Sequence, residues 1–239
     1  MCQALPKEMG MDKRREDVLD APYFHVVFTV PQELNPLIYS NQQLLYDTLY
    51  HSVSATVNEL TADTKHLGAK VGYICVLHTW GSEMNFQPHI HVILLGGGLT
   101  ANNQWRDKGE EFFLPVKVLS KLFRGKYLDE LKILWEENKL QFHGSSVKYR
   151  NHYAFKELLN TCYEKDWIPH CKKTFNGAQS VINYLGKYTH RIAISNHRII
   201  RMDENTVTYY VKDYREKGKW KEFTISGVEF ILKGPVPHD

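Results

Sequence analysis

The chain has 239 residues, of which 43% are hydrophobic and 24% charged, and its formal net charge is +3. No run of 18 apolar residues occurs and the first twenty residues are rich in charge, so we expect no membrane span, no secretory signal and a cytosolic location. The four cysteines, Cys2, Cys75, Cys162 and Cys171, have no CxxC spacing. This pattern argues against a disulfide framework and against a self-contained zinc module, and we expect the cysteines to be reduced thiols.

The elements follow from the period at which apolar residues recur along the chain. Ser40 and Gln43 have the form of a capping box ahead of a long amphipathic helix, whose Tyr46 and Tyr50 we interpret as packing residues. The run Gly96 to Gly98 predicts a turn, and it lacks the spacing of a phosphate-binding loop. The predicted strands are 21–31, 70–79, 88–95 and about 167–172, and the predicted helices are about 41–61, 115–135, 151–164 and one that follows Asn176.

Two histidines stand at alternate positions, His89 and His91, in the apolar stretch QPHIHVILLGGG. Alternate residues of a strand share one face, so the two imidazoles project side by side and can hold one metal ion. With 12 His in the chain, chance alone gives roughly 0.6 such pairs. The alternative is therefore a pair of half-buried histidines bonded to backbone carbonyls.

A third histidine ends the preceding predicted strand, which a short polar turn joins to the strand of His89 and His91. This spacing predicts an antiparallel hairpin. If the register pairs His78 with His89, their Cβ atoms lie about 5 Å apart. His78 is then the candidate third ligand, with His25 and Glu83 as reserves. The alternative for His78 is a strand-end histidine that faces water.

Two tyrosines one helical turn apart, Tyr184 and Tyr188, lie in NGAQSVINYLGKYTHRIAIS. On a helical wheel they and Arg191 fall within about 60° of one another, between an apolar arc and Lys187. A phenolate is a competent nucleophile toward phosphorus, and a metal ion or Lys187 would favour the ionised form. The alternative is an ordinary packed aromatic pair.

The C-terminal part, from His197 to Ile225, predicts a β meander that interleaves cations with aromatic residues. Between Lys187 and Lys221 the chain has nine Lys or Arg and four Asp or Glu, a local balance of +5. Cations that meet phosphates and aromatic faces that stack on bases are typical of single-strand DNA binding, and the alternative is a solvated amphipathic sheet. The candidate DNA contacts are Lys187, Arg191, Arg198, Arg201, Lys212 and Arg215.

From about Cys2 to Phe230 the chain resembles the IS-ninety-one-like insertion-sequence transposases, two-tyrosine members of the HUH superfamily. The phrases that carry the resemblance are FHVVFTVPQELNPL, VLHTWGSEMNFQPHIHVILLGGG, FFLPVKVLSKLFRGK and YLGKYTHRIAISNHR. The resemblance implies an α+β fold. Its antiparallel HUH-type sheet, of split βαβ or ferredoxin/RRM-like order, is flanked by helices, and a C-terminal β meander follows.

The resemblance also implies a chemistry. His89 and His91 match the metal-binding pair, Tyr184 and Tyr188 the nucleophiles, and Lys187 a phosphate contact. The implied activity is rolling-circle DNA transposition and recombination in a bacterial cytoplasm, on the nucleoid when bound to DNA. In this activity the protein would cut and rejoin single-stranded DNA at transposon ends through a 5′-phosphotyrosine intermediate, with Mg²⁺ or Mn²⁺.

The chain departs from the family pattern at both ends, MCQALPKE and EFILKGPVPHD. We expect a remnant of an N-terminal zinc-binding region at 1–20, an endonuclease core at 21–195 with a helical insertion at about 112–165, and a basic meander with a truncated C-terminus at 196–239. The main alternative is thus a remnant that binds single-stranded DNA without cutting it. A replication initiator of the same superfamily is another. A histidine-triad nucleotide hydrolase is disfavoured because residue 93 is Ile.

Overall fold

The computed structural model describes residue 19 and residues 21–81, 85–109, 114–167, 169–175, 198–213 and 219–233. The chain divides into two compact units. The first comprises Met1–His78 and Pro88–Gly186, and the second comprises Thr79–Gln87 and Lys187–Asp239. The candidate histidines all belong to the first unit.

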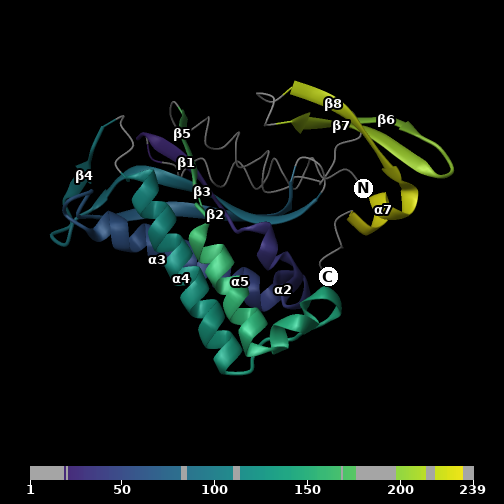
Figure 1. Cartoon of the computed structure of the whole chain (residues 1–239). Helices are drawn as coiled ribbons and strands as arrows, with labels where there is room; N and C mark the ends of the chain where they lie inside the picture. The colour runs from purple at the N-terminus through teal and green to yellow at the C-terminus, as the bar shows by residue number, and fades with distance from the viewer. Residues whose placement is uncertain are drawn as a thin grey trace. The chain divides into compact units, whose positions relative to one another are not determined.

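The first unit is built on an antiparallel sheet in the order β2-β3-β1-β5 (Figure 1). Strand β1 pairs antiparallel with both β3 and β5. Strands β1 and β2 are consecutive in the chain but β3 lies between them, which is the split βαβ order that the resemblance implied. The α+β fold is therefore confirmed. The strands are β1 Tyr23–Thr29, β2 Lys70–Trp80, β3 Phe86–Leu99, β5 His170–Phe175 and the short β4 Trp105–Asp107, which pairs with β3.

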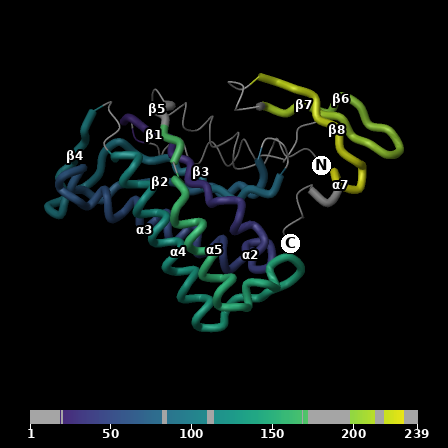
Figure 2. The backbone as a smooth tube through the Cα atoms, viewed as in Figure 1, coloured from purple at the N-terminus to yellow at the C-terminus, as the bar shows by residue number. Residues whose placement is uncertain are grey.

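Helices lie along one face of this sheet (Figures 1 and 2). Their buried apolar side chains form the core with the sheet. Phe28 of β1 meets Phe123 of α4 edge to face at 5.1 Å, and Phe123 meets Trp167 at 5.4 Å between ring centres. Such aromatic pairs stabilise a core beyond the area that they bury. The helical elements of this unit are η1 Gln32–Leu34, α2 Asn35–Ser40, α3 Gln42–Ala62, α4 Val116–Glu136, η2 Gly144–Arg150 and α5 His152–Glu164.

The two faces of the sheet differ in chemistry because side chains alternate along each strand. On β1, Phe24, Val26 and Phe28 are fully buried and face the core. His25 and Val27 alternate with them and lie on the opposite face. The histidine face of the sheet is therefore the one that does not form this apolar core.

The second unit contains the predicted meander, which is confirmed as a three-stranded sheet in the order β6-β7-β8. Its strands are β6 Ile199–Met202, β7 Thr206–Asp213 and β8 Lys219–Ser226, and helix α7 Gly227–Lys233 follows. Val207, Tyr209, Val211 and Ile225 form its small core, against which Trp80 also packs.

Two local predictions were wrong. Ser40 does not cap the long helix: it ends α2, and its hydroxyl donates to the carbonyl of Pro36, while Asn41 precedes α3 without a side-chain cap. The three glycines do not form a turn but continue β3 to Leu99. A Cβ at Gly97 would meet the ring of Trp105, and one at Gly98 would meet the backbone of Lys70. Glycine is needed there so that neighbouring chains can approach closely.

Three of the predicted free thiols are described, and burial raises the pKa of Cys75 to about 11 and of Cys162 and Cys171 to about 12. Only the thiolate reacts with iodoacetamide. We expect native protein at pH 8 to be alkylated at these positions more than about tenfold more slowly than urea-unfolded protein, as peptide mass spectrometry would measure. Equal rates would contradict the burial.

The same shifts have a consequence for stability. The folded thiols keep their protons at a pH where unfolded thiols, with a pKa of about 8.5, lose theirs. The contribution of these thiols to the free energy of unfolding is therefore fully present below about pH 8.5. It is lost as the pH rises toward the pKa values of the folded protein.

Candidate functional site

Three histidines meet on the face of the central hairpin opposite the apolar core. His78 comes from β2, and His89 and His91 come from β3. The ring centre of His78 lies 5.4 Å from that of His89 and 4.4 Å from that of His91. The ring centres of His89 and His91 lie 4.9 Å apart. One ring nitrogen of each residue lies within 4.8 Å of the others. We call these three residues the histidine cluster.

The strand beneath the histidine cluster is held firmly. Ile90 and Val92 alternate with the histidines and are fully buried against the core. A side chain on a strand anchored in this way has little freedom to move, which is what a preorganised ligand requires. His78 and His91 are themselves only 6% and 8% exposed.

The edge strand β2 is fixed beside His78 by a tyrosine of α3. The backbone N–H of Leu77 donates to the hydroxyl of Tyr50 at 3.0 Å. Burial raises the pKa of Tyr50, and it raises the pKa of Tyr46 to about 12. A raised pKa opposes phenolate formation, so both tyrosines are poor nucleophiles. Their contacts agree with the prediction that they are packing residues.

A fourth histidine touches the histidine cluster from β1. Nε2 of His25 lies 2.7 Å from Nδ1 of His91, and both side chains are buried. His25, a reserve candidate for the third ligand, lies outside the group of three whose nitrogens converge. Glu83, the other reserve, lies outside the described residues.

The donor set of the histidine cluster fits a divalent metal ion. Imidazole nitrogen is a common ligand for first-row transition metals, and three such ligands leave coordination positions open for water or substrate. An all-nitrogen set suits a transition metal better than Mg²⁺, which prefers oxygen. Among the residues that the structure describes, this is the group of His, Cys, Asp or Glu side chains whose geometry could hold an ion.

The meander places some of the predicted DNA contacts. Arg198 is 9% exposed, and its guanidinium donates twice to the carbonyl of Tyr210, at 2.9 and 2.7 Å. Arg198 therefore braces β7, and little of its charge reaches the surface. Lys212 lies beside Trp220, which is 56% exposed, with Nζ 5.8 Å from the ring centre. Arg201 is exposed on β6.

Both predicted nucleophiles and three of the predicted cations lie outside the described residues. Their roles stay predictions from the sequence. These residues are Tyr184, Lys187, Tyr188, Arg191 and Arg215.

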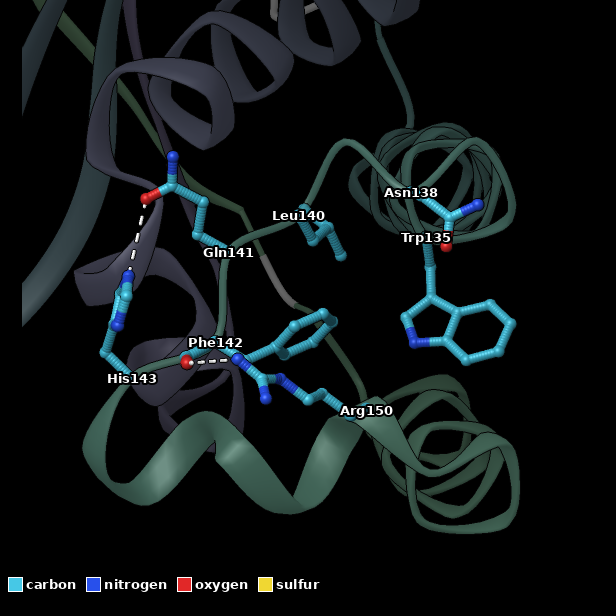
Figure 3. Close-up of a pocket in the computed structure, with 7 residues that line it drawn as sticks. All are labelled: Trp135, Asn138, Leu140, Gln141, Phe142, His143 and Arg150. Atoms are coloured by element: carbon cyan, nitrogen blue, oxygen red, sulfur yellow. Dashed lines mark hydrogen bonds between the residues drawn. The ribbon is translucent and has the colours of Figure 1, made fainter.

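A cavity of about 550 Å³ lies elsewhere in the first unit (Figure 3). It is lined by the end of α4, the segment after it and Arg150 of η2, and it includes none of the histidine cluster. The Arg150 side chain donates to the carbonyl of Phe142 at 3.5 Å, and Nε2 of His143 lies 3.4 Å from Oε1 of Gln141. The polar groups of the cavity thus bond within its own wall, which indicates a structural hollow.

The described part of the chain contains no helix that is both long and apolar enough to cross a bilayer.

Comparison with known proteins identifies the family of this chain. The family model Y2_Tnp, described as "Putative transposase", matches residues 72–234, which include the whole histidine cluster. The chain belongs to this transposase family. The recognition of a transposase is therefore confirmed.

Two curated transposases are similar over almost the whole chain. "Putative transposase y4qJ" of Sinorhizobium fredii is 38% identical over 97% of this chain and 58% of its own length. The transposase for insertion sequence element IS801 of Pseudomonas savastanoi pv. phaseolicola is 26% identical over 90% of this chain and 50% of its own length. The chain therefore spans about half the length of the curated relatives that it matches.

Among solved structures, the conjugative relaxase TrwC in complex with oriT DNA is similar at a TM-score of 0.36 and 18% identity. The likeness covers 46% of this chain and 44% of the relaxase. A metal-bound structure of the same relaxase gives the same TM-score and identity.

Proposed function

We propose that this member of the transposase family is a metal-dependent endonuclease and strand transferase that acts on single-stranded DNA at transposon ends. The observation that carries the proposal is the histidine cluster: three imidazoles from two neighbouring strands converge within 4.8 Å in a chain of this family. His78, His89 and His91 would hold the ion, and we favour Mn²⁺ over Mg²⁺ because all three ligands are nitrogen. A bound ion supplies Lewis-acid polarisation of the scissile phosphodiester.

The nucleophile in this proposal is the phenolate of Tyr184 or Tyr188. Its oxygen forms a bond to phosphorus while the bond from phosphorus to the 3′ oxygen breaks, and the proton lost by the phenol is balanced by the one that the 3′ hydroxyl gains. The product is a 5′-phosphotyrosine and a free 3′ hydroxyl, so the energy of the broken ester is kept for rejoining. Since an ordinary tyrosine pKa is about 10, Lys187 would favour the phenolate.

The DNA strand would be held in part by the meander. Lys212 and the exposed Arg201 can meet phosphates, and the neighbouring Trp220 offers an exposed ring to a base. Arg191 and Arg215 are proposed for the same role from the sequence alone. Arg198 would act by bracing β7 beneath this surface.

The experiment that tests the proposal uses the purified chain and labelled single-stranded DNA from the flanks of the gene that encodes it. With Mn²⁺ we expect a covalent protein–DNA band on a denaturing gel, and with EDTA we expect none. Measurable DNA binding without any covalent band in Mn²⁺ would instead favour the alternative, a protein that binds single-stranded DNA without cutting it. The alternative of a replication initiator shares this chemistry, and the DNA sequence that is cut would separate the two.

A further inference from the structure

His25 and His91 are joined by a short hydrogen bond across β1 and β3. In the register of these strands Val27 pairs with His91 and His25 pairs with Ile93, so His25 is the diagonal neighbour of His91 on the same face. Nε2 of His25 lies 2.7 Å from Nδ1 of His91. The side chains are 9% and 8% exposed, so water competes little for this bond.

The two rings meet edge to edge. Their planes differ by only 7°, and their centres lie 5.0 Å apart, much farther than the two bonded nitrogens. Rings stacked face to face would not bring single nitrogens this close at that centre separation. The contact is therefore an in-line hydrogen bond between nearly coplanar imidazoles, which fixes the rotation of the His91 ring about its own axis.

This contact decides which nitrogen of His91 would bind an ion. A bond between two neutral imidazoles needs one N–H donor and one acceptor. Because Nδ1 of His91 bonds to His25, an ion held by His91 in the histidine cluster would be bound through Nε2. Nδ1 must then carry the proton and donate to Nε2 of His25. A ligand histidine is commonly oriented in this way by an acceptor on its other nitrogen.

We propose that His25 is a positioning residue that holds His91 in its metal-binding orientation and tautomer, and is not itself a ligand. This inference rests on the proposed metal-binding function of the histidine cluster. It assigns to a neutral imidazole the acceptor role that a carboxylate or backbone carbonyl commonly fills.

The test compares two substitutions in the full chain. His25→Phe keeps a flat ring and removes the acceptor, and we expect Mn²⁺ binding to weaken about tenfold or more. In His25→Gln the amide oxygen reaches about as far as Nε2 and can accept the same N–H, so it should recover most of that loss. His51→Phe, at an exposed position of α3, serves as the control and should leave Mn²⁺ affinity unchanged. Wild-type affinity in His25→Phe would overturn the positioning role.

A second measurement does not depend on any variant folding. Nitrogen-15 NMR of the wild type loaded with diamagnetic Zn²⁺ should show His91 with its proton on Nδ1, and His25 with its proton on Nδ1 as well. A His91 proton on Nε2 would overturn the inference. A third measurement returns to the variant: Co²⁺ bound to His25→Phe should show a changed visible absorption spectrum, since the orientation of one ligand ring is no longer fixed.

Failure of this inference can be told apart from failure of the proposed function. If His91→Ala abolishes Mn²⁺ binding while His25→Phe does not weaken it, only the positioning role is wrong. If His91→Ala also leaves Mn²⁺ affinity unchanged, the histidine cluster is not the metal site and both proposals are wrong.

Discussion

Replacing His89 and His91 together by alanine is expected to weaken Mn²⁺ binding at least about a hundredfold, because two of three convergent imidazoles are removed. The expected loss exceeds that of any single substitution, since one remaining imidazole cannot fix an ion against water. Isothermal titration calorimetry of the purified variant would measure it. The wild-type chain titrated in the same buffer gives the reference affinity.

The single variants locate the third ligand. We expect His78→Ala to weaken Mn²⁺ binding about as much as His91→Ala does, since both rings border the same point. His51→Ala, on the exposed surface of α3, is the matched control for loss of a histidine. Unchanged affinity in His78→Ala would move the third position to His25 or Glu83, and a move to His25 would also contradict its positioning role.

Replacing Tyr184 and Tyr188 together by phenylalanine is expected to abolish the covalent DNA adduct altogether. Phenylalanine keeps the ring and its packing but has no oxygen that could bond to phosphorus. DNA binding should stay within about twofold of wild type, because the substitution removes no charge. Denaturing gels would measure the adduct, and fluorescence anisotropy with a labelled single strand would measure binding.

The matched control for this pair is Tyr153→Phe. Tyr153 is 73% exposed at the start of α5, so its hydroxyl can be removed with little effect on the fold. Its adduct yield should equal that of wild type. Adduct that survives in the double variant would show that another residue is the nucleophile.

The histidine cluster could be predicted from the sequence because it depends only on residues that are close together in the chain. Alternation along one strand places His89 and His91 on the same face, and a short connection brings the end of the previous strand beside them. The hairpin pairing of β2 with β3 that this reasoning assumed is present, and His78 lies against both other rings. Each step needed only neighbours in the chain.

The contact between His25 and His91 could not be predicted in the same way. It depends on β1 lying beside β3 in a particular register, and 66 positions separate the two residues. Single-sequence periodicity shows which face a residue takes but not which strand lies next to it. The resemblance implied the order of the sheet, but not this register.

One other difference has the same cause. Gly96 to Gly98 resemble a turn locally, but pairing of β3 with β4 and the close approach of Lys70 keep them in a strand. Tertiary contacts override the local pattern there. The bond from the Arg198 guanidinium to the carbonyl of Tyr210, twelve residues away, likewise does not follow from the sequence pattern, and the contact of Arg198 with DNA stays a prediction.

The most direct test of the account is to ask which part of the cut strand stays on the protein. The wild-type chain is incubated in Mn²⁺ with the same single-stranded DNA, labelled in separate reactions at its 3′ or its 5′ end. A 5′-phosphotyrosine predicts that the 3′ label moves with the protein on a denaturing gel and that the 5′ label is released on a shorter strand. The 5′ label on the protein, or equal adduct in EDTA, would contradict a metal-dependent tyrosine nuclease built on the histidine cluster.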